Sequence, residues 1–210
     1  MDGAEFRDAV VEAKRTELDR LGSNKLLVAL TDADLTSERV LRAAADSENA
    51  AHNTFAAWAD DEPDEDAREA FADAADRERE HRERVLAELD DGYEPADGGA
   101  LHEYLRGREG AVQRLAAGFV GRGLVADQTH KQVVSFFVNE AAESRANLFR
   151  ELRTETEASL ERGLELLEAR CEDEEAWDDA RAVAEYTVQV AYDDYADALR
   201  GMGVDPKPVC

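Results

Sequence analysis

The sequence contains only two cysteines, Cys171 and Cys210, and no Cys-x-x-Cys pair. This scarcity argues against a disulfide scaffold and against a cysteine-based metal site. Cys171 falls on an apolar helical stripe, so we expect it in the core, whereas the sequence assigns no role to Cys210. No apolar run approaches the roughly 18 residues of a membrane span, and nothing resembles a signal peptide. We therefore expect a cytoplasmic protein that does not enter a membrane.

Basic residues are also few. The chain has 25 lysines and arginines against 50 aspartates and glutamates, which gives a formal net charge of -25. This acidity is spread along the whole chain and is typical of proteins from a salt-loving cytoplasm, where molar salt screens the repulsion between carboxylates. It also makes direct binding to nucleic acid unlikely, because phosphate requires basic patches. Lysine is especially rare and occurs only at Lys14, Lys25, Lys131 and Lys207.

Helix-forming residues dominate, and no strand alternation appears, so the sequence predicts an all-α fold in a single domain over 1–210. A helical hairpin over 37–90 carries its turn at 60–63, and the short link makes its two helices antiparallel. The segment 90–99 has glycines and a proline and predicts a linker, and 201–210 predicts an extended tail. The other expected helices cover 4–21, 100–137 with breaks near Gly107 and Gly123, 141–171, and a last stretch that ends near 200.

Two apolar stripes of the hairpin are interrupted by residues that bind metals. Steps of three and four residues place Glu48 on the same helix face as Leu41 and Phe55, and Glu78 and His81 on the same face as Phe71. A carboxylate on a core-facing stripe is costly unless it is paired or bound to a cation. Glu78 and His81 form a Glu-x-x-His pair that can bind one ion, and this ligand set suits iron or manganese. We therefore predict a metal site at Glu48, Glu78 and His81.

At these residues the chain resembles the rubrerythrin branch of the ferritin-like superfamily. The similar stretches are RAAADSENAAHNTFAAWA, at 42–59, and AREAFADAADREREHRERVLAEL, at 67–89. The resemblance implies an antiparallel four-helix bundle, here with extra N-terminal and central helices. It also implies that Glu48, Glu78 and His81 are iron ligands, and that the activity is peroxide reduction or ferrous iron oxidation. Since the rubredoxin-type cysteines that some members of the family carry are missing, such an activity would need a separate redox partner.

The chain departs from this family in its second half, which lacks the second Glu-x-x-His. Asp127-x-x-His130 is the nearest substitute, although a local pair between these two residues is the simpler expectation. Four residues could supply a further carboxylate, and none stands out: Glu143, Glu155, Glu185 and Asp194.

Alternatives to a complete iron site therefore remain open. Glu78 and His81 could form buried hydrogen bonds with an arginine such as Arg42 or Arg82. The protein would then be a non-catalytic interaction or regulatory protein, for example a transcription-associated one. In a third case, two copies of the hairpin would complete one site in a homodimer. We expect His52 at the helix surface or beside the ligands, and we expect packing roles for Trp177, Tyr186, Tyr192 and Tyr195.

Overall fold

The computed structural model describes residues 1–89 and 92–207, and within these ranges it is helical with no strand, which confirms the all-α prediction. Cys210, part of the predicted linker (90–91) and the end of the tail (208–210) lie outside the described residues. None of the described helices is long and apolar enough to span a bilayer. The helices are α1 (Gly3–Ala13), α2 (Arg15–Leu21), α3 (Lys25–Leu30), α4 (Ser37–Asp61), α5 (Glu65–Leu86), α6 (Ala100–Arg106), α7 (Gly110–Arg114), the π-helix η1 (Leu115–Gly121), α8 (Arg122–Asn139), α9 (Glu143–Arg170) and α10 (Glu174–Gly201).

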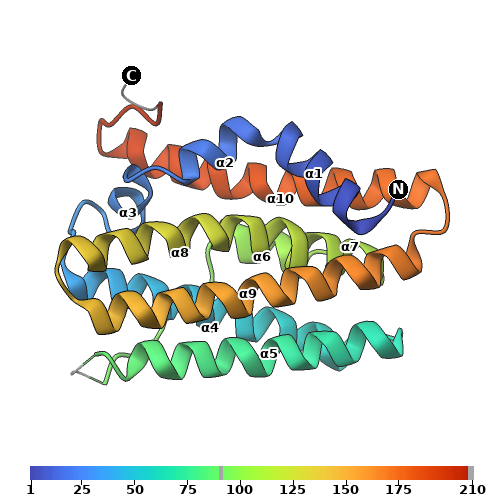
Figure 1. The fold of residues 1–210 in the computed structure, drawn as a ribbon, viewed down its shortest axis with the longest axis horizontal. Helices are drawn as coiled ribbons and strands as arrows, with labels where there is room; N and C mark the ends of the chain where they lie inside the picture. Colours follow the sequence, from blue (N-terminus) through green and yellow to red (C-terminus); the bar gives the residue numbers. More distant parts are fainter. Residues whose placement is uncertain (90–91, 208–210) are drawn as a thin grey trace.

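The long helices form a bundle built from two hairpins (Figure 1). Helices α4 and α5 form the first hairpin, and α8 and α9 form the second, which packs on the first through α5 and α9. Helix α10 covers η1 and part of α8, and α1 and α2 lie against α8, α9 and α10. Figure 1 shows α10 on the side of the second hairpin that faces away from α5. The inner faces of both hairpins are therefore closed off by other helices of the same chain.

The first hairpin begins and turns at residues that favour these positions. The Thr36 hydroxyl accepts a hydrogen bond from the backbone N–H of Arg39 and caps α4. Asp64 caps α5 in the same way by accepting from Ala67, at 2.9 Å. Glu62 in the turn between the helices is buried and forms an ion pair with Arg114, at 3.0 Å. The cap of α5 and the ion pair of Glu62 both fix this turn, and the turn sets the axial position of α4 relative to α5.

Both predicted stripes are buried. Leu41, Phe55 and Trp58 on α4 and Phe71 and Val85 on α5 are each at most 2% exposed. The rings of Phe55, Trp58 and Phe71 pack against one another, and Phe119 of η1 joins them. The expected burial of Cys171 is confirmed, as is that of Trp177, Tyr192 and Tyr195. Tyr186 instead is 56% exposed and packs its ring on Tyr104.

The predicted helix boundaries need three corrections. The expected helix over 4–21 is divided at Lys14 into α1 and α2, and the short helix α3 was not predicted. The expected break near Gly123 is wrong, because the chain stays helical from α7 through η1 into α8. Glycines in this stretch allow close packing: a Cβ on Gly118 would lie 2.6 Å from Trp58, and one on Gly121 would lie 2.5 Å from Thr187. The break near Gly107 is confirmed.

Candidate metal centre

Glu48, Glu78 and His81 lie together in the interior of the bundle. One possible ligand atom from each residue lies within 4.8 Å of the other two. The Nδ1 atom of His81 is 3.8 Å from a carboxylate oxygen of Glu48 and 3.9 Å from one of Glu78. All three side chains are buried, and His81 is fully enclosed. The shared helix phase read from the sequence therefore corresponds to a real cluster between α4 and α5.

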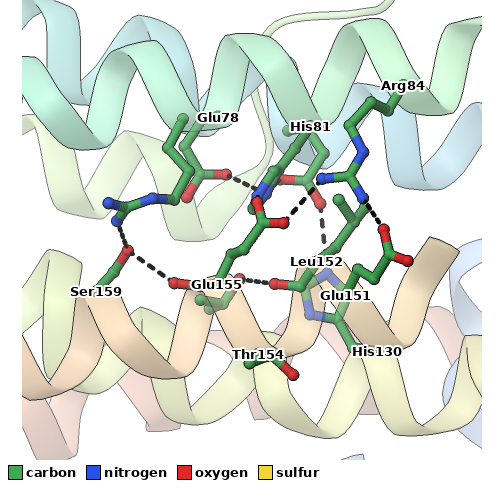
Figure 2. Close-up of polar contacts among 12 residues, drawn as sticks. Glu78, His81, Arg84, His130, Glu151, Leu152, Thr154, Glu155 and Ser159 are labelled. Carbon is green, nitrogen blue, oxygen red and sulfur yellow. Dashed lines mark hydrogen bonds and ion pairs between the residues drawn. The ribbon is translucent and has the colours of Figure 1, made fainter. Parts of the chain in front are cut away.

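The imidazole of His81 is held in a defined orientation by α9. Its Nε2 donates a hydrogen bond to Oε2 of Glu155, at 2.8 Å (Figure 2). Its Nδ1 is buried and has no hydrogen-bond partner. A histidine that donates from one nitrogen to a carboxylate and presents the other nitrogen to two further carboxylates has the arrangement of a metal ligand with its supporting acid. Among the four acids considered from sequence, Glu155 is the one that contacts the cluster.

Glu155 is in turn fixed by Arg84. The Arg84 guanidinium lies between Glu155, at 2.9 Å, and Glu151, at 2.6 Å, as Figure 2 shows. Burial alone would raise the pKa of Glu155, but the hydrogen bonds from His81 and Arg84 outweigh it and lower that pKa. Glu155 therefore remains an anion that accepts from His81. The other acids lie elsewhere: Glu185 pairs with Arg181, Glu143 is exposed on the first turn of α9, and Asp194 is exposed on α10.

A cation from the chain itself already lies in the cluster. Arg122, at the start of α8, donates two hydrogen bonds to the carboxylate of Glu78, at 3.0 and 2.9 Å. Its guanidinium also lies 3.9 Å from Glu48. This residue was not among the arginines considered from sequence. Arg82 instead donates to Asn49, and Arg42 pairs with Glu38.

His130 also reaches the cluster, although Asp127 does not. The Nε2 atom of His130 lies 3.4 Å from Oε1 of Glu48, and the ring is 5% exposed. Asp127 forms ion pairs with Lys131 and Arg153. The expected local pair of Asp127 and His130 is therefore wrong. His52 lies outside the cluster, where it links the two helices of the first hairpin through its Nδ1 and the carbonyl of Ala75, 2.8 Å apart.

The two buried carboxylates differ in pKa. Burial raises the pKa of Glu48, but the neighbouring imidazoles of His130 and His81 outweigh it and hold that pKa well below its usual range. Burial and the neighbouring Glu48 raise the pKa of Glu78 to about 8, against the opposing effect of Arg122. Burial lowers the pKa of His81, yet Glu48, Glu78 and Glu155 together raise it. The raised pKa values of Glu78 and His81 favour bound protons in this cluster, at the place where a metal ion would supply positive charge.

This set of ligands suits a hard or borderline divalent cation. Two carboxylates and one imidazole suit iron or manganese, whose sites favour oxygen ligands with some histidine. Arg122, the arginine beside these ligands, contributes one positive charge and cannot give up its proton. Comparisons with known proteins add nothing to this geometry: no family model, no curated protein and no solved structure matches the chain.

Proposed function

We propose that this protein is a ferritin-like helical bundle of the rubrerythrin branch that binds one iron or manganese ion at Glu48, Glu78 and His81. The observation that carries the proposal is the Nδ1 atom of His81. It is buried without a hydrogen-bond partner and faces two carboxylates, while Glu155 holds the opposite nitrogen. A buried polar atom without a partner is costly, and a bound cation would remove that cost.

Arg122 limits the site to a single ion. In ferritin-like di-iron proteins the second half of the bundle supplies another glutamate and another Glu-x-x-His pair. Here α8 places the guanidinium of Arg122 against Glu78, and α9 offers Glu155, whose carboxylate is engaged by His81 and Arg84. A second metal ion beside Glu78 would be repelled by the permanent charge of Arg122. We therefore propose a mononuclear centre.

When bound, iron or manganese would supply the one-electron steps of peroxide reduction or ferrous oxidation. The residues of the chain would hold and orient this ion. Glu155 fixes the imidazole of His81, and Arg122 offsets one of the two carboxylate charges. Because the sequence has no Cys-x-x-Cys pair for an electron-transfer centre, electrons would come from a separate partner.

The experiment is a metal titration of the purified full-length chain. Protein is prepared in molar salt, stripped with a chelator and titrated anaerobically with Fe²⁺ and, separately, with Mn²⁺. We expect one ion per chain, and loss of at least about tenfold in affinity in Glu78→Gln and in His81→Ala, since loss of even supporting residues costs about 10–100-fold. The matched control is Glu80→Gln on the exposed face of the same helix, which should bind as the wild type does.

A second candidate function is a non-catalytic interaction or regulatory protein that keeps the bundle without the metal. The ion pair of Arg122 with Glu78 favours it, because this pair neutralises a buried carboxylate without any ion. The same titration separates the two: wild type and both ligand variants would then show equally low metal content. The homodimer alternative has less support, since α8 and α9 of the same chain already cover the face of the first hairpin that carries the cluster.

A further inference from the structure

A second feature of the interior lies beside the cluster and is not explained by metal binding. A cavity of about 300 Å³ opens between α3, α4, α6, α8 and α10. Its walls are mostly aliphatic and include Leu26, Leu27, Val40, Val125 and Val133. Glu48, Arg122, His130 and His102 of α6 also line it. The cavity therefore has an apolar body and a small number of polar groups, which is the usual character of a small-molecule site.

The hydrogen bonds of Thr54 determine the tautomer of His102. The Thr54 hydroxyl lies 2.7 Å from the backbone carbonyl of Ala50, which can only accept, so the single hydroxyl proton points there. Its oxygen then accepts from Arg106 Nε, at 3.2 Å. It also accepts from Nδ1 of His102, at 3.1 Å, so the ring proton lies on Nδ1. The Nε2 atom of His102 consequently carries a lone pair.

This lone pair has no partner within the described part of the chain, although the His102 side chain is only 5% exposed and lines the cavity. Burial, assisted by Arg122 and Arg106, lowers the pKa of His102 to about 3, so the ring stays neutral and the acceptor persists. The same two arginines oppose the binding of an organic cation at this point. An anion would meet the lone pair of Nε2 and the carboxylates of Asp46 and Glu48, which line the cavity and offset the two arginines. The matching group is a neutral hydrogen-bond donor.

We propose that this cavity binds a small uncharged alcohol or phenol, whose hydroxyl donates a hydrogen bond to Nε2 of His102 and whose hydrocarbon part fills the aliphatic walls. An engineered cavity of 150 Å³ holds benzene, so twice that volume accommodates about 12 non-hydrogen atoms. The proposal does not require the metal ion. Binding rests on His102 and the apolar walls, none of which belongs to the predicted ligand set.

The test compares two molecules of equal size in metal-stripped protein labelled with ¹⁵N-histidine. We use 4-propylphenol, which has a hydroxyl, and 4-propyltoluene, which has a methyl group in its place. We expect 4-propylphenol to bind about tenfold more tightly, the effect of one good hydrogen bond. The ¹⁵N signal of His102 Nε2 should show an unprotonated nitrogen in the free protein and should move only when the phenol is added.

Two variants keep the result interpretable. His102→Phe retains a ring and removes the acceptor, so 4-propylphenol should then bind no more tightly than 4-propyltoluene. Ala126→Leu narrows the cavity and should weaken both together. Equal affinities in the wild type, or a protonated Nε2 in the free protein, would overturn the proposal. Because the protein is stripped of metal throughout, a failed metal titration leaves this result unaffected, and loss of phenol binding leaves the metal result unaffected.

Discussion

Arg122 and Glu78 form a bidentate ion pair inside the bundle, with both guanidinium–carboxylate distances at about 3 Å. The pair joins α8 to α5 and places a permanent positive charge beside two buried carboxylates. A buried arginine cannot be neutralised by losing its proton, so this charge remains at every accessible pH. The metal-free bundle therefore has an internal counter-ion, and a metal ion would add to it.

Removal of this arginine should make the stability of the bundle depend on metal. Arg122→Gln leaves Glu78 buried without its partner, and breaking a buried pair in this way costs about 3–5 kcal/mol. In chelator we expect a much lower melting temperature than for the wild type. Addition of Mn²⁺ should restore most of the loss, because the ion replaces the missing charge. If Mn²⁺ did not change the melting temperature of Arg122→Gln, the metal site would be contradicted.

Glu155 should support His81 without binding the ion itself. Glu155→Gln removes the negative charge that accepts from His81 Nε2, and we expect metal affinity to fall by about 10–100-fold with the stoichiometry unchanged. The matched control is Glu151→Gln, which removes the other carboxylate partner of Arg84 and lies away from His81. Isothermal titration of both variants measures the difference. Equal affinities in the two variants would contradict the orienting role.

We expect His102 to lower the free energy of unfolding of the protein in mild acid. Its pKa is about 3 in the folded chain against an ordinary value of 6.5. As the pH falls below about 6.5, the unfolded chain takes up a proton that the folded chain does not. The free energy of unfolding should then fall by about 1.4 kcal/mol per pH unit on account of this residue. Urea unfolding of the wild type and His102→Phe between pH 6.5 and 5 isolates this contribution, because the carboxylates titrate alike in both. If the free energies of unfolding of the wild type and His102→Phe changed with pH in parallel, this prediction would be wrong.

Salt should stabilise the protein. With a net charge of -25, repulsion between carboxylates opposes the compact state. Raising potassium chloride from 0.1 to 1 M shortens the screening length from about 10 to about 3 Å, so the melting temperature should rise. Sucrose at matched concentration serves as an uncharged control for general stabilisation. An equal rise in sucrose, or no change in salt, would remove the halophilic interpretation.

The sequence predicts the first hairpin well because two independent signals agree there. Caps and a short turn fix its ends, and helical periodicity places Glu48, Glu78 and His81 on one side, where the structure has them. Arg122 was missed for a physical reason. A regular period of 3.6 residues fails across η1, so the face that Arg122 presents cannot be counted from the residues before it.

Glu155 illustrates a different limit. Periodicity places an acid on a helix face, but it does not say which of several acids meets a histidine on another helix. That choice depends on the axial position of α9 against α5, which distant packing sets. The close approach of Gly163 to Phe119, whose Cβ atoms would be 2.2 Å apart with an alanine at 163, is one such contact. The pairing of Glu155 with His81 is therefore a tertiary property.

The π-helix η1 gives the chain a place where its length can change. A π-helix arises when one residue is added to an α-helix, and the added residue is absorbed as one wide turn. Loss of one residue between Leu115 and Gly121 would return this turn to regular helix, and α8 would keep nearly the same face toward Glu48 and Glu78. The same deletion within a regular α-helix would instead rotate everything beyond it by about 100°. The chain can therefore lose one residue in η1 and still hold Arg122 beside Glu78.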